Sequence, residues 1–309
     1  MKEIAIICNL TAGSGQAEKR WEKFQTELDS ASIDYTVHFT EASNHATDLT
    51  KNVINNGTKR IVSFGGDGTL NEIIQGMIST SAGFRGDLEL VVLGAGSSND
   101  FDKTFEKIPW IEKIQGDKII PIDLVRLDYI NFNGNSATRF FVNNSSIGVI
   151  SQAGDRFNNV SGLTKAMKRV SVDVAAVIAG VQTIITWDPM IVNLVVEGET
   201  ESDISISNLT VYKNPYIAGD MYYNQCVDRG DGILSVAIVD VESRMKLLGL
   251  IPSLYNGNAL DKEGTRYFEC EWLELQTNHD VVIETDGEIV GHPPARYTIM
   301  KHAIRTVIG

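Results

Sequence analysis

The sequence predicts an α/β domain followed by an all-β domain, and three observations support this prediction. Short apolar strands alternate with amphipathic helices through the first part of the chain, which is typical of a parallel sheet covered by helices. A glycine turn separates a strand from a helix within residues 61–74. After about residue 127, strands follow one another with turn residues between them, which favours a β-sandwich. We therefore expect one domain at 1–126 and a second at 127–296.

Length and composition agree with this division. A chain of 309 residues and 33.9 kDa can bury two cores, and 43% hydrophobic with 22% charged residues is ordinary for a soluble protein. The net charge of −13 argues against nucleic-acid binding and against adsorption to an anionic membrane through net charge. A local basic patch is compatible with that balance.

Cysteine usage and hydropathy indicate a cytoplasmic protein. Cys8, Cys226 and Cys270 are far apart and show neither metal-ligand spacing nor a disulfide framework. No signal peptide is recognised before the first strand. The longest apolar run, 170–187, includes Asp173 and is too short to span a membrane, so we interpret it as a packed or interfacial helix.

The first two strands are expected at Glu3–Cys8 and Asp34–Phe39. The first runs into a glycine-containing loop at 9–15, and open α/β sheets place ligands at the carboxyl ends of their strands. The helix after it has apolar residues on one face at Ala17, Trp21, Phe24 and Leu28. The second strand is followed by Thr40 and by a helix with Leu49, Val53 and Ile54 on its inner face, ending at Gly57.

The third strand, Ile61–Phe64, leads into Gly65-Gly66-Asp67-Gly68-Thr69 and a helix beginning near Thr69. Glycines allow backbone N–H groups to approach one anion, and the positive end of the helix points at the same place, so the loop predicts phosphate binding. Asp67 would repel a phosphate unless a divalent cation lay between them. An ordinary strand-helix turn with a surface aspartate is the alternative.

The fourth strand, Leu88–Leu93, ends in a second glycine turn, 94–101, with a serine cap at Ser97. Its Asp100 is placed to join Asp67 around a cation. A fifth strand at Lys118–Leu127 carries Asp123, and a lone aspartate in an apolar strand costs free energy unless it is paired or bound to metal.

The second half contains a hairpin signal at 132–135 and one helical insert at about 164–187. The remaining strands of this half are expected at Thr138–Asn143, Met190–Glu197, Asp203–Tyr212, Gly232–Asp240, Tyr267–Leu275 and Asp280–Glu284.

The two glycine turns resemble the nucleotide loops of the diacylglycerol kinase catalytic family, which includes bacterial lipid kinases and is related to sphingosine kinases. The resemblance rests on 65–69 with Asn71 and Glu72, and on Ser98-Asn99-Asp100-Phe101. NAD kinases and phosphofructokinases carry similar first loops. The resemblance implies an NAD-kinase/phosphofructokinase-like nucleotide-binding domain before the β-sandwich, with segment 297–309 returning to the first domain.

The resemblance also implies which residues contact ATP: Asn9, Gly13, Ser14, Gly15, Thr40, Gly65, Gly66, Asp67, Gly68, Thr69, Asn71, Glu72, Gly96, Ser97 and Asn99. Thr40 serves equally well as a helix cap. The chain departs from the family pattern at three positions. The family has proline where this chain has Leu10 and Gly94, and the family has lysine where this chain has Gln16.

Two magnesium sites are implied in the same way. Asp67, Asp100 and Asp123 would organise a catalytic magnesium, directly or through water. Asp231, with the carbonyl oxygens of Asp228 and Ile233, would hold a structural magnesium, although an Asp-Gly turn between strands explains this segment equally well.

The segment Glu284-Thr285-Asp286-Gly287-Glu288 matches the family's Asp-Gly-Glu segment at the interdomain cleft. An acceptor alcohol needs a carboxylate within hydrogen-bonding reach to take its proton as the phosphoryl group transfers. Either Asp286 or Glu288 is a candidate for that base. With Asp67, these two form the predicted catalytic set.

The sequence thus predicts an ATP-dependent, magnesium-using lipid kinase whose acceptor is a diacylglycerol-like hydroxyl. An NAD kinase and a nucleotide-binding regulator that has lost catalysis are the alternatives. The sequence does not identify the lipid. It also leaves the oligomeric state undetermined, and a homodimer is one of the alternatives. Arg156, Lys165, Lys168 and Arg169 beside the apolar helix form a candidate docking patch for peripheral contact with the inner face of the membrane. A solvated helix face is the alternative interpretation of these residues.

Overall fold

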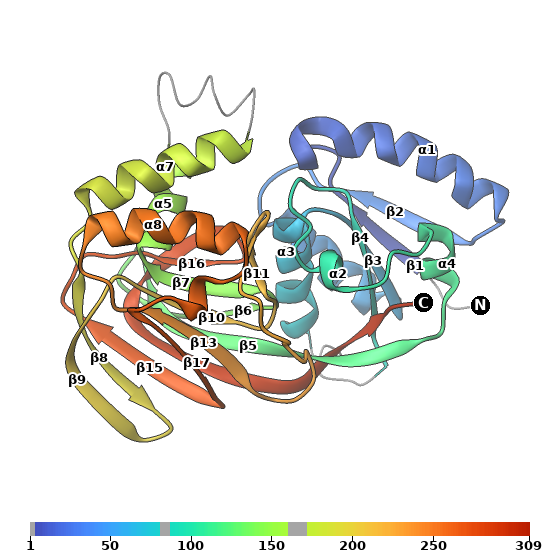
Figure 1. Ribbon diagram of the computed structural model, residues 1–309. Coiled ribbons are helices and arrows are strands. Elements are labelled where there is room, and N and C mark those ends of the chain that lie inside the picture. The colour runs from blue at the N-terminus through green and yellow to red at the C-terminus, as the bar shows by residue number, and fades with distance from the viewer. Residues whose placement is uncertain (1–3, 81–86, 160–171) are drawn as a thin grey trace. The chain divides into compact units, whose positions relative to one another are not determined.

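The computed structural model describes residues 4–80, 87–159 and 172–309, and the chain divides into two compact units (Figure 1). Unit 1 contains Met1–Leu124, Arg229–Asp231 and Met300–Gly309, and unit 2 contains Val125–Asp228 and Gly232–Ile299. Strands β5 (Ile119–Asn131) and β17 (Glu288–Val307) each begin in one unit and end in the other.

Unit 1 is built on a parallel sheet with the order β2-β1-β3-β4, and the end of β17 adds a further parallel strand beside β4. Its strands are β1 (Ile4–Cys8), β2 (Tyr35–Phe39), β3 (Arg60–Gly65) and β4 (Glu89–Gly94). Its helices are α1 (Gln16–Ser30), α2 (His45–Asn55), α3 (Asp67–Ile78) and α4 (Trp110–Gln115). Because the strands run parallel, the loops after β1, β3 and β4 leave the sheet at one edge.

Helix α1 packs on the sheet through the face that the sequence predicts. Ala17, Trp21, Phe24 and Leu28 are all buried in one core cluster. Phe64 is the residue before Gly65. The centroid of its ring lies 5.3 Å from that of Trp21, 5.7 Å from that of Phe24 and 5.3 Å from that of Trp110 in α4. The contacts with Trp21 and Trp110 are edge-to-face, whereas the contact with Phe24 is stacked, and aromatic contacts of both kinds fix ring orientation. They hold the end of β3 in place immediately before its glycine turn.

A buried ion pair crosses from β3 to β4. The Arg60 guanidinium lies 2.7 Å from the Glu89 carboxylate and also donates to the Ile114 carbonyl, with side chains only 5% and 6% exposed. Removing one partner would leave an uncompensated buried charge.

We therefore expect Arg60→Met to lower the free energy of unfolding by about 3–5 kcal/mol, as measured by urea denaturation. Lys51→Met is the matched control, because Lys51 pairs with Asp48 at 3.1 Å on an exposed face, and it should change stability by less than about 0.5 kcal/mol. Equal losses of unfolding free energy in the two variants would show that the buried pair contributes no more to stability than the exposed pair.

The strands of unit 2 form two rows, and neighbouring strands within each row are antiparallel. One row of strands has the order β14-β13-β10-β7-β16, and a second has the order β9-β8-β15. The bounds in the first row are β14 (Thr265–Cys270), β13 (Leu234–Val239), β10 (Asn208–Tyr212), β7 (Asn144–Gly148) and β16 (Ile283–Thr285). Those in the second are β9 (Glu199–Ile206), β8 (Met190–Val196) and β15 (Trp272–Thr277).

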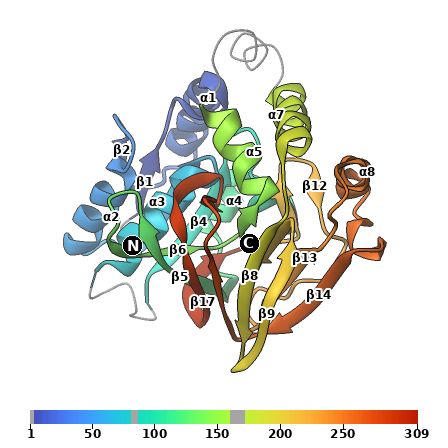
Figure 2. The same cartoon turned by 90° about the vertical axis from the view of Figure 1, so that its left-hand side faces the viewer.

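Strand β17 pairs with β16 and with β15, so it connects the two rows, and both rows contribute to one hydrophobic core. Figure 2 shows β8 beside β9 and β13 beside β14. The short strands are β6 (Ser136–Phe141), which pairs with β5, and the hairpin of β11 (Tyr216–Ala218) and β12 (Met221–Tyr222).

The described part of unit 2 includes the α-helices α5 (Val149–Asn158), α7 (Val172–Thr186) and α8 (Arg244–Tyr255). Helix α7 contacts both of the others. In the part of the chain that the structure describes, no helix combines the length and the apolar character needed to cross a membrane.

Several boundaries differ from the sequence prediction. Helix α3 begins at Asp67 rather than near Thr69. The expected strands at 203–212 and 267–275 are each two strands, divided at Ser207 and at Glu271. Ser207 and Glu271 bond outside the regular ladder, to Val239 O and to Glu197 Oε1. Helices α5 and α8 were not predicted, because their surroundings read as a strand-rich region.

Candidate functional site

Three loops of unit 1 meet at the carboxyl edge of its parallel sheet, with backbone packed on backbone. A Cβ atom at Gly96 would lie only 2.4 Å from the Gly66 Cα, so the second glycine turn touches the first. A Cβ at Gly13 would lie 3.2 Å from the Ala95 carbonyl oxygen. The Ala95 and Gly96 N–H groups both donate to the Gly65 carbonyl, at 2.8 and 3.1 Å. Side chains larger than hydrogen would force these loops apart.

The loop after β1 is tied to the start of α3 by Asn9. The Asn9 Nδ2 group donates to Thr69 Oγ1 at 3.0 Å, and its Oδ1 accepts from the Thr11 N–H and hydroxyl groups at 3.0 and 2.8 Å. The loop then turns through three residues with positive φ: Gly13 (+59°), Ser14 (+57°) and Gly15 (+86°). Ser14 adopts this conformation despite its Cβ, which costs free energy and marks a constrained turn.

Asp67 connects the first glycine turn to the second. Its Oδ2 accepts the Asp100 N–H at 3.1 Å and its Oδ1 accepts the Phe101 N–H at 3.2 Å. Asp67 is also the first residue of α3, where a negative charge is favourable beside the positive end of the helix dipole. One carboxylate therefore holds two loops in register.

The second turn is ordered from within and carries a lysine that the sequence analysis overlooked. Asn99 has φ +53°, accepts the Gly96 N–H at 2.8 Å and donates to Gly96 O at 3.0 Å. Asp100 pairs with Lys103 Nζ at 2.9 Å. The i,i+3 spacing of this pair is visible in the sequence and is a signal that could have been used.

Two arginines also reach this turn from distant parts of unit 1. Arg229 stacks over the rings of Phe101 and Phe105, at 4.4 and 4.9 Å, and donates to Phe101 O and Thr104 Oγ1 at 3.2 and 2.6 Å. Arg20 of α1 donates to Gly94 O at 3.4 Å. Nothing in the local sequence signals either contact, because both depend on tertiary folding.

The other predicted contacts of unit 1 are placed differently. Thr40 follows β2, and its N–H donates to Cys8 O at 2.9 Å, at the same edge of the sheet. Ser97 is exposed in the second turn, whereas Asn71 is fully buried in α3. The Glu72 carboxylate accepts the Asn44 and Ala46 N–H groups at 2.8 and 3.0 Å. Glu72 thus caps α2, whose N-cap residue makes no capping bond of its own.

Asp123 is 1% exposed, and its Oδ1 accepts the His302 N–H of β17 at 2.8 Å. Among the described residues, no group of three or more His, Cys, Asp or Glu side chains is arranged to hold a metal ion. Asp67, Asp100 and Asp123 therefore do not form a direct three-carboxylate site.

The turn at 284–288 in unit 2 is built by two buried carboxylates. Asp286, with φ +46° and 6% exposure, accepts the backbone N–H groups of residues 142, 143 and 144 at 3.0–3.2 Å. Glu284 accepts the Gly287 N–H at 2.5 Å. Glu288 differs: its side chain is 38% exposed, and it pairs with Arg139 Nη2 at 2.5 Å.

An ammonium group from outside the predicted structural-magnesium segment contacts two of its carbonyl oxygens. Lys213 Nζ donates to the carbonyl oxygens of Asp228, at 2.5 Å, and Ile233, at 2.9 Å. The side chains of Asp228 and Asp231 are exposed. No motif in the sequence points to Lys213 as a partner of this segment.

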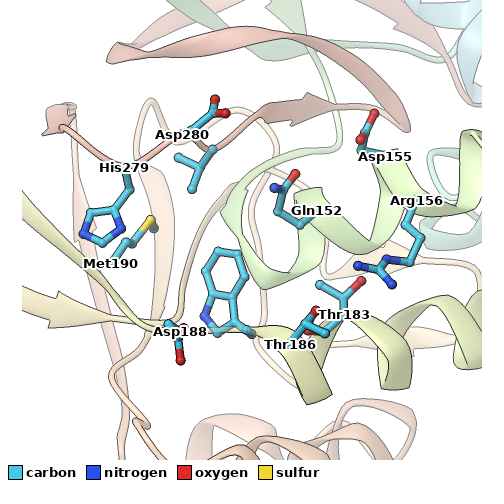
Figure 3. A pocket seen from close by; sticks show the side chains of 11 residues that line it. Gln152, Asp155, Arg156, Thr183, Thr186, Asp188, Met190, His279 and Asp280 are labelled. Carbon is cyan, nitrogen blue, oxygen red and sulfur yellow. The ribbon is translucent and has the colours of Figure 1, made fainter.

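A cavity of about 320 Å³ lies in unit 2 beside α5 and α7 (Figure 3). Charged and polar side chains dominate its lining, among them Asp155, Arg156, Asp188 and His279. A lining of this kind does not suit an acyl chain. Among the described residues, Arg156 of the predicted docking patch contributes to it.

Cys8 and Cys270 are buried and do not offer thiolate chemistry at neutral pH. Burial raises the pKa of the Cys8 and Cys270 thiols to about 12, so both are protonated at neutral pH. Cys226 is exposed.

Two family models match the chain. The diacylglycerol kinase catalytic domain matches residues 3–127, and the YegS C-terminal NAD kinase beta sandwich-like domain matches residues 148–308. The chain is 24% identical over 302 residues to "Putative lipid kinase YtlR" of Bacillus subtilis, covering 94% of each chain. It is 22% identical over 307 residues to a diacylglycerol kinase of Mycobacterium tuberculosis, covering 95% of this chain and 93% of that protein.

Solved structures show the same fold. A diacylglycerol kinase from Bacillus anthracis superposes with a TM-score of 0.74 at 21% identity, covering 100% of this chain and 97% of that one. Yeast NADH kinase complexed with NADH has a TM-score of 0.53 at 10% identity, covering 99% and 83%. The predicted fold class, an NAD-kinase-like α/β domain followed by a β-sandwich, is confirmed.

Proposed function

The chain belongs to the diacylglycerol kinase family of lipid kinases, and from this premise we propose that it transfers the γ-phosphate of ATP to the hydroxyl of a diacylglycerol-like lipid. The observation that carries the proposal is the backbone contact between Gly66 and Gly96. It brings two glycine turns and the start of α3 together where parallel sheets bind ligands.

On the nucleotide side, the first-turn N–H groups of α3 lack intrahelical acceptors, as in every helix, and face in the direction that favours an anion. Asn9 fixes the loop after β1 to Thr69, and Asp67 fixes the second turn to the first. We assign phosphate and ribose contacts to these three loops. Phosphoryl transfer depends mainly on positioning and charge neutralisation, so such rigidity matters.

Magnesium would accompany ATP and neutralise charge on its phosphates. Asp67 is the half-buried carboxylate at the loops, and carboxylate oxygen is the ligand type that magnesium prefers. Since the described side chains form no three-ligand group, Asp67 would hold the ion, with Asp100 and Asp123 acting through water. Magnesium commonly keeps several waters and binds substrate phosphates in this way.

On the acceptor side, we assign the proton acceptor to Glu288 and a positioning role to Asp286. Asp286 directs both carboxylate oxygens at backbone N–H groups and is almost fully buried. Glu288 is accessible and is oriented by Arg139. As the lipid oxygen bonds to the γ-phosphorus and ADP leaves, the hydroxyl proton passes to Glu288. A loose transition state requires only a weak base.

A lipid acceptor implies contact with a membrane surface, and we include peripheral contact in the proposal. Of the predicted docking patch, Arg156 is exposed near the end of α5. Lys165, Lys168 and Arg169 lie outside the described residues.

The proposal is tested by supplying labelled ATP and magnesium with mixed micelles of diacylglycerol, monoacylglycerol, phosphatidylglycerol or a sphingoid base, and separately with NAD. We expect label on a diacylglycerol-like lipid. Glu288→Gln should lower kcat by about 10²–10⁴-fold, since it removes the general base, with little change in unfolding temperature because the side chain is partly exposed. Glu242→Gln, also exposed, is the matched control.

Two results would contradict the proposal. Label on NAD would make the chain an NAD kinase, and ATP binding without transfer to any acceptor would make it a regulator. Full activity in Glu288→Gln would overturn the assignment of the base and leave the lipid assignment standing.

A further inference from the structure

Lys213 is a buried cation in unit 2 that the proposed reaction does not use. It follows β10 directly and is 1% exposed. Its ammonium donates to Asp228 O at 2.5 Å and to Ile233 O at 2.9 Å. These two carbonyl groups stand on either side of the Arg229–Asp231 segment, so one side chain spans a turn of the backbone.

The backbone around Lys213 is held in place, so the ammonium has a fixed direction. The Lys213 N–H donates to Asn143 O at 2.8 Å, and the Asn214 side chain donates to Asn143 Oδ1 at 2.7 Å. Ile233 comes immediately before β13, which pairs with β10. Both ends of the Lys213–Ile233 contact are therefore anchored in neighbouring strands.

A buried ammonium is tolerated only when its donors are satisfied, because desolvation of an isolated charge is costly. Carbonyl oxygens that converge on one point commonly bind a cation, either by coordinating a metal ion or by accepting hydrogen bonds from an ammonium group. The convergence of Asp228 O and Ile233 O is thus a small cation site.

The carbonyls of Asp228 and Ile233 are the same oxygens that the sequence led us to expect around a structural magnesium. A magnesium ion needs its oxygen ligands at about 2.0–2.1 Å. An ion at that distance from both carbonyls would lie against the Lys213 ammonium, and two positive charges in one buried place repel strongly. The lysine and a divalent cation therefore exclude each other.

We propose that Lys213 is a built-in cation that takes the place of a divalent metal ion at the carbonyls of Asp228 and Ile233. The turn between these residues is then ordered without metal. Any requirement of this protein for magnesium arises at the nucleotide alone. The proposal does not depend on the identity of the phosphoryl acceptor.

The first test measures the wild-type protein without nucleotide. We expect the same unfolding temperature in EDTA, in magnesium chloride and in calcium chloride, and no binding of Mn²⁺ followed by paramagnetic resonance. A chelator-dependent fall in unfolding temperature, or one tightly bound Mn²⁺ per chain, would overturn the proposal. This test uses the wild-type protein, so its result does not depend on whether a variant folds.

The second test uses Lys213→Ala with Lys262→Ala as the matched control, because Lys262 is exposed. Lys213→Ala removes the ammonium group that donates to both carbonyls, so the unfolding temperature of the variant in EDTA should fall by about 5–10 °C. Magnesium or calcium should restore much of that loss, and the control should not respond. An unchanged unfolding temperature, or a loss that no divalent cation reverses, would show that Lys213 does not stand at a cation site.

Discussion

Replacing Asp67 with asparagine is expected to lower kcat by about 10²–10³-fold with the fold retained. The Asp67 carboxylate accepts the N–H groups of Asp100 and Phe101, one on each oxygen. Asparagine keeps one acceptor and turns an NH₂ donor toward the other N–H group. That N–H loses its partner, the second glycine turn shifts, and the negative charge at the start of α3 is lost.

The measurement is steady-state transfer of labelled γ-phosphate, together with urea unfolding of the same preparations. Asp48→Asn, on the exposed face of α2, is the matched control and should retain full activity. Asp67→Glu separates two causes, since it keeps the charge but displaces the oxygens by one methylene group. If kcat of Asp67→Glu falls as far as kcat of Asp67→Asn, the register of the two loops, rather than the charge, determines activity. Activity of Asp67→Asn within about threefold of wild type would remove Asp67 from the catalytic set.

The sequence was most informative where local chemistry decides the structure. Three glycines within four residues, between an apolar strand and an amphipathic helix, are typical of a strand-turn-helix connection. The structure has this connection at the expected place, with Gly65 ending β3 and Asp67 beginning α3. The buried face of α1 was also predicted, because a periodic apolar pattern has only one way to meet a sheet. The start of α3 was misplaced by two residues, since Asp67 was assigned to the loop rather than to the first turn.

Contacts between distant segments were beyond the reach of local patterns. Arg229 clamps Phe101 from a turn more than a hundred residues away in sequence, and Glu72 caps α2 from α3. In both cases the residue type is informative only after tertiary folding has brought the partner close. Lys213 belongs to the same group, because a lysine after a strand normally indicates a surface position.

The acceptor turn shows what geometry adds to a motif. From the sequence, Asp286 and Glu288 were equal candidates for the base. The two carboxylates have different surroundings: Asp286 is enclosed by backbone N–H groups, whereas Glu288 is partly exposed beside Arg139. Assignment of the base to Glu288 is a prediction that follows from accessibility.

Gly96→Ala is the second change for which we expect a large effect, because it tests the contact that carries the functional proposal. The added Cβ would lie 2.4 Å from Gly66 Cα, and neither backbone has a flexible end that could yield. The two turns must separate, and a displacement of about 1 Å at a catalytic site costs on the order of 10² in rate. We expect kcat/KM for ATP to fall by about 10²-fold or more, with a loss of stability of about 1–3 kcal/mol.

A graded series makes this prediction specific. A Cβ at Gly66 would lie 3.3 Å from Gly96 Cα, which requires only a small adjustment, whereas a Cβ at Gly249 of α8 would meet nothing within 4 Å. The losses of kcat/KM should therefore rank Gly96→Ala above Gly66→Ala, with Gly249→Ala close to wild type. Calorimetric titration with ATP should show the same ranking in affinity. If Gly96→Ala binds ATP as tightly as Gly249→Ala does, the nucleotide is not bound against these two turns, and the assignment of the phosphate site to them would have to be abandoned.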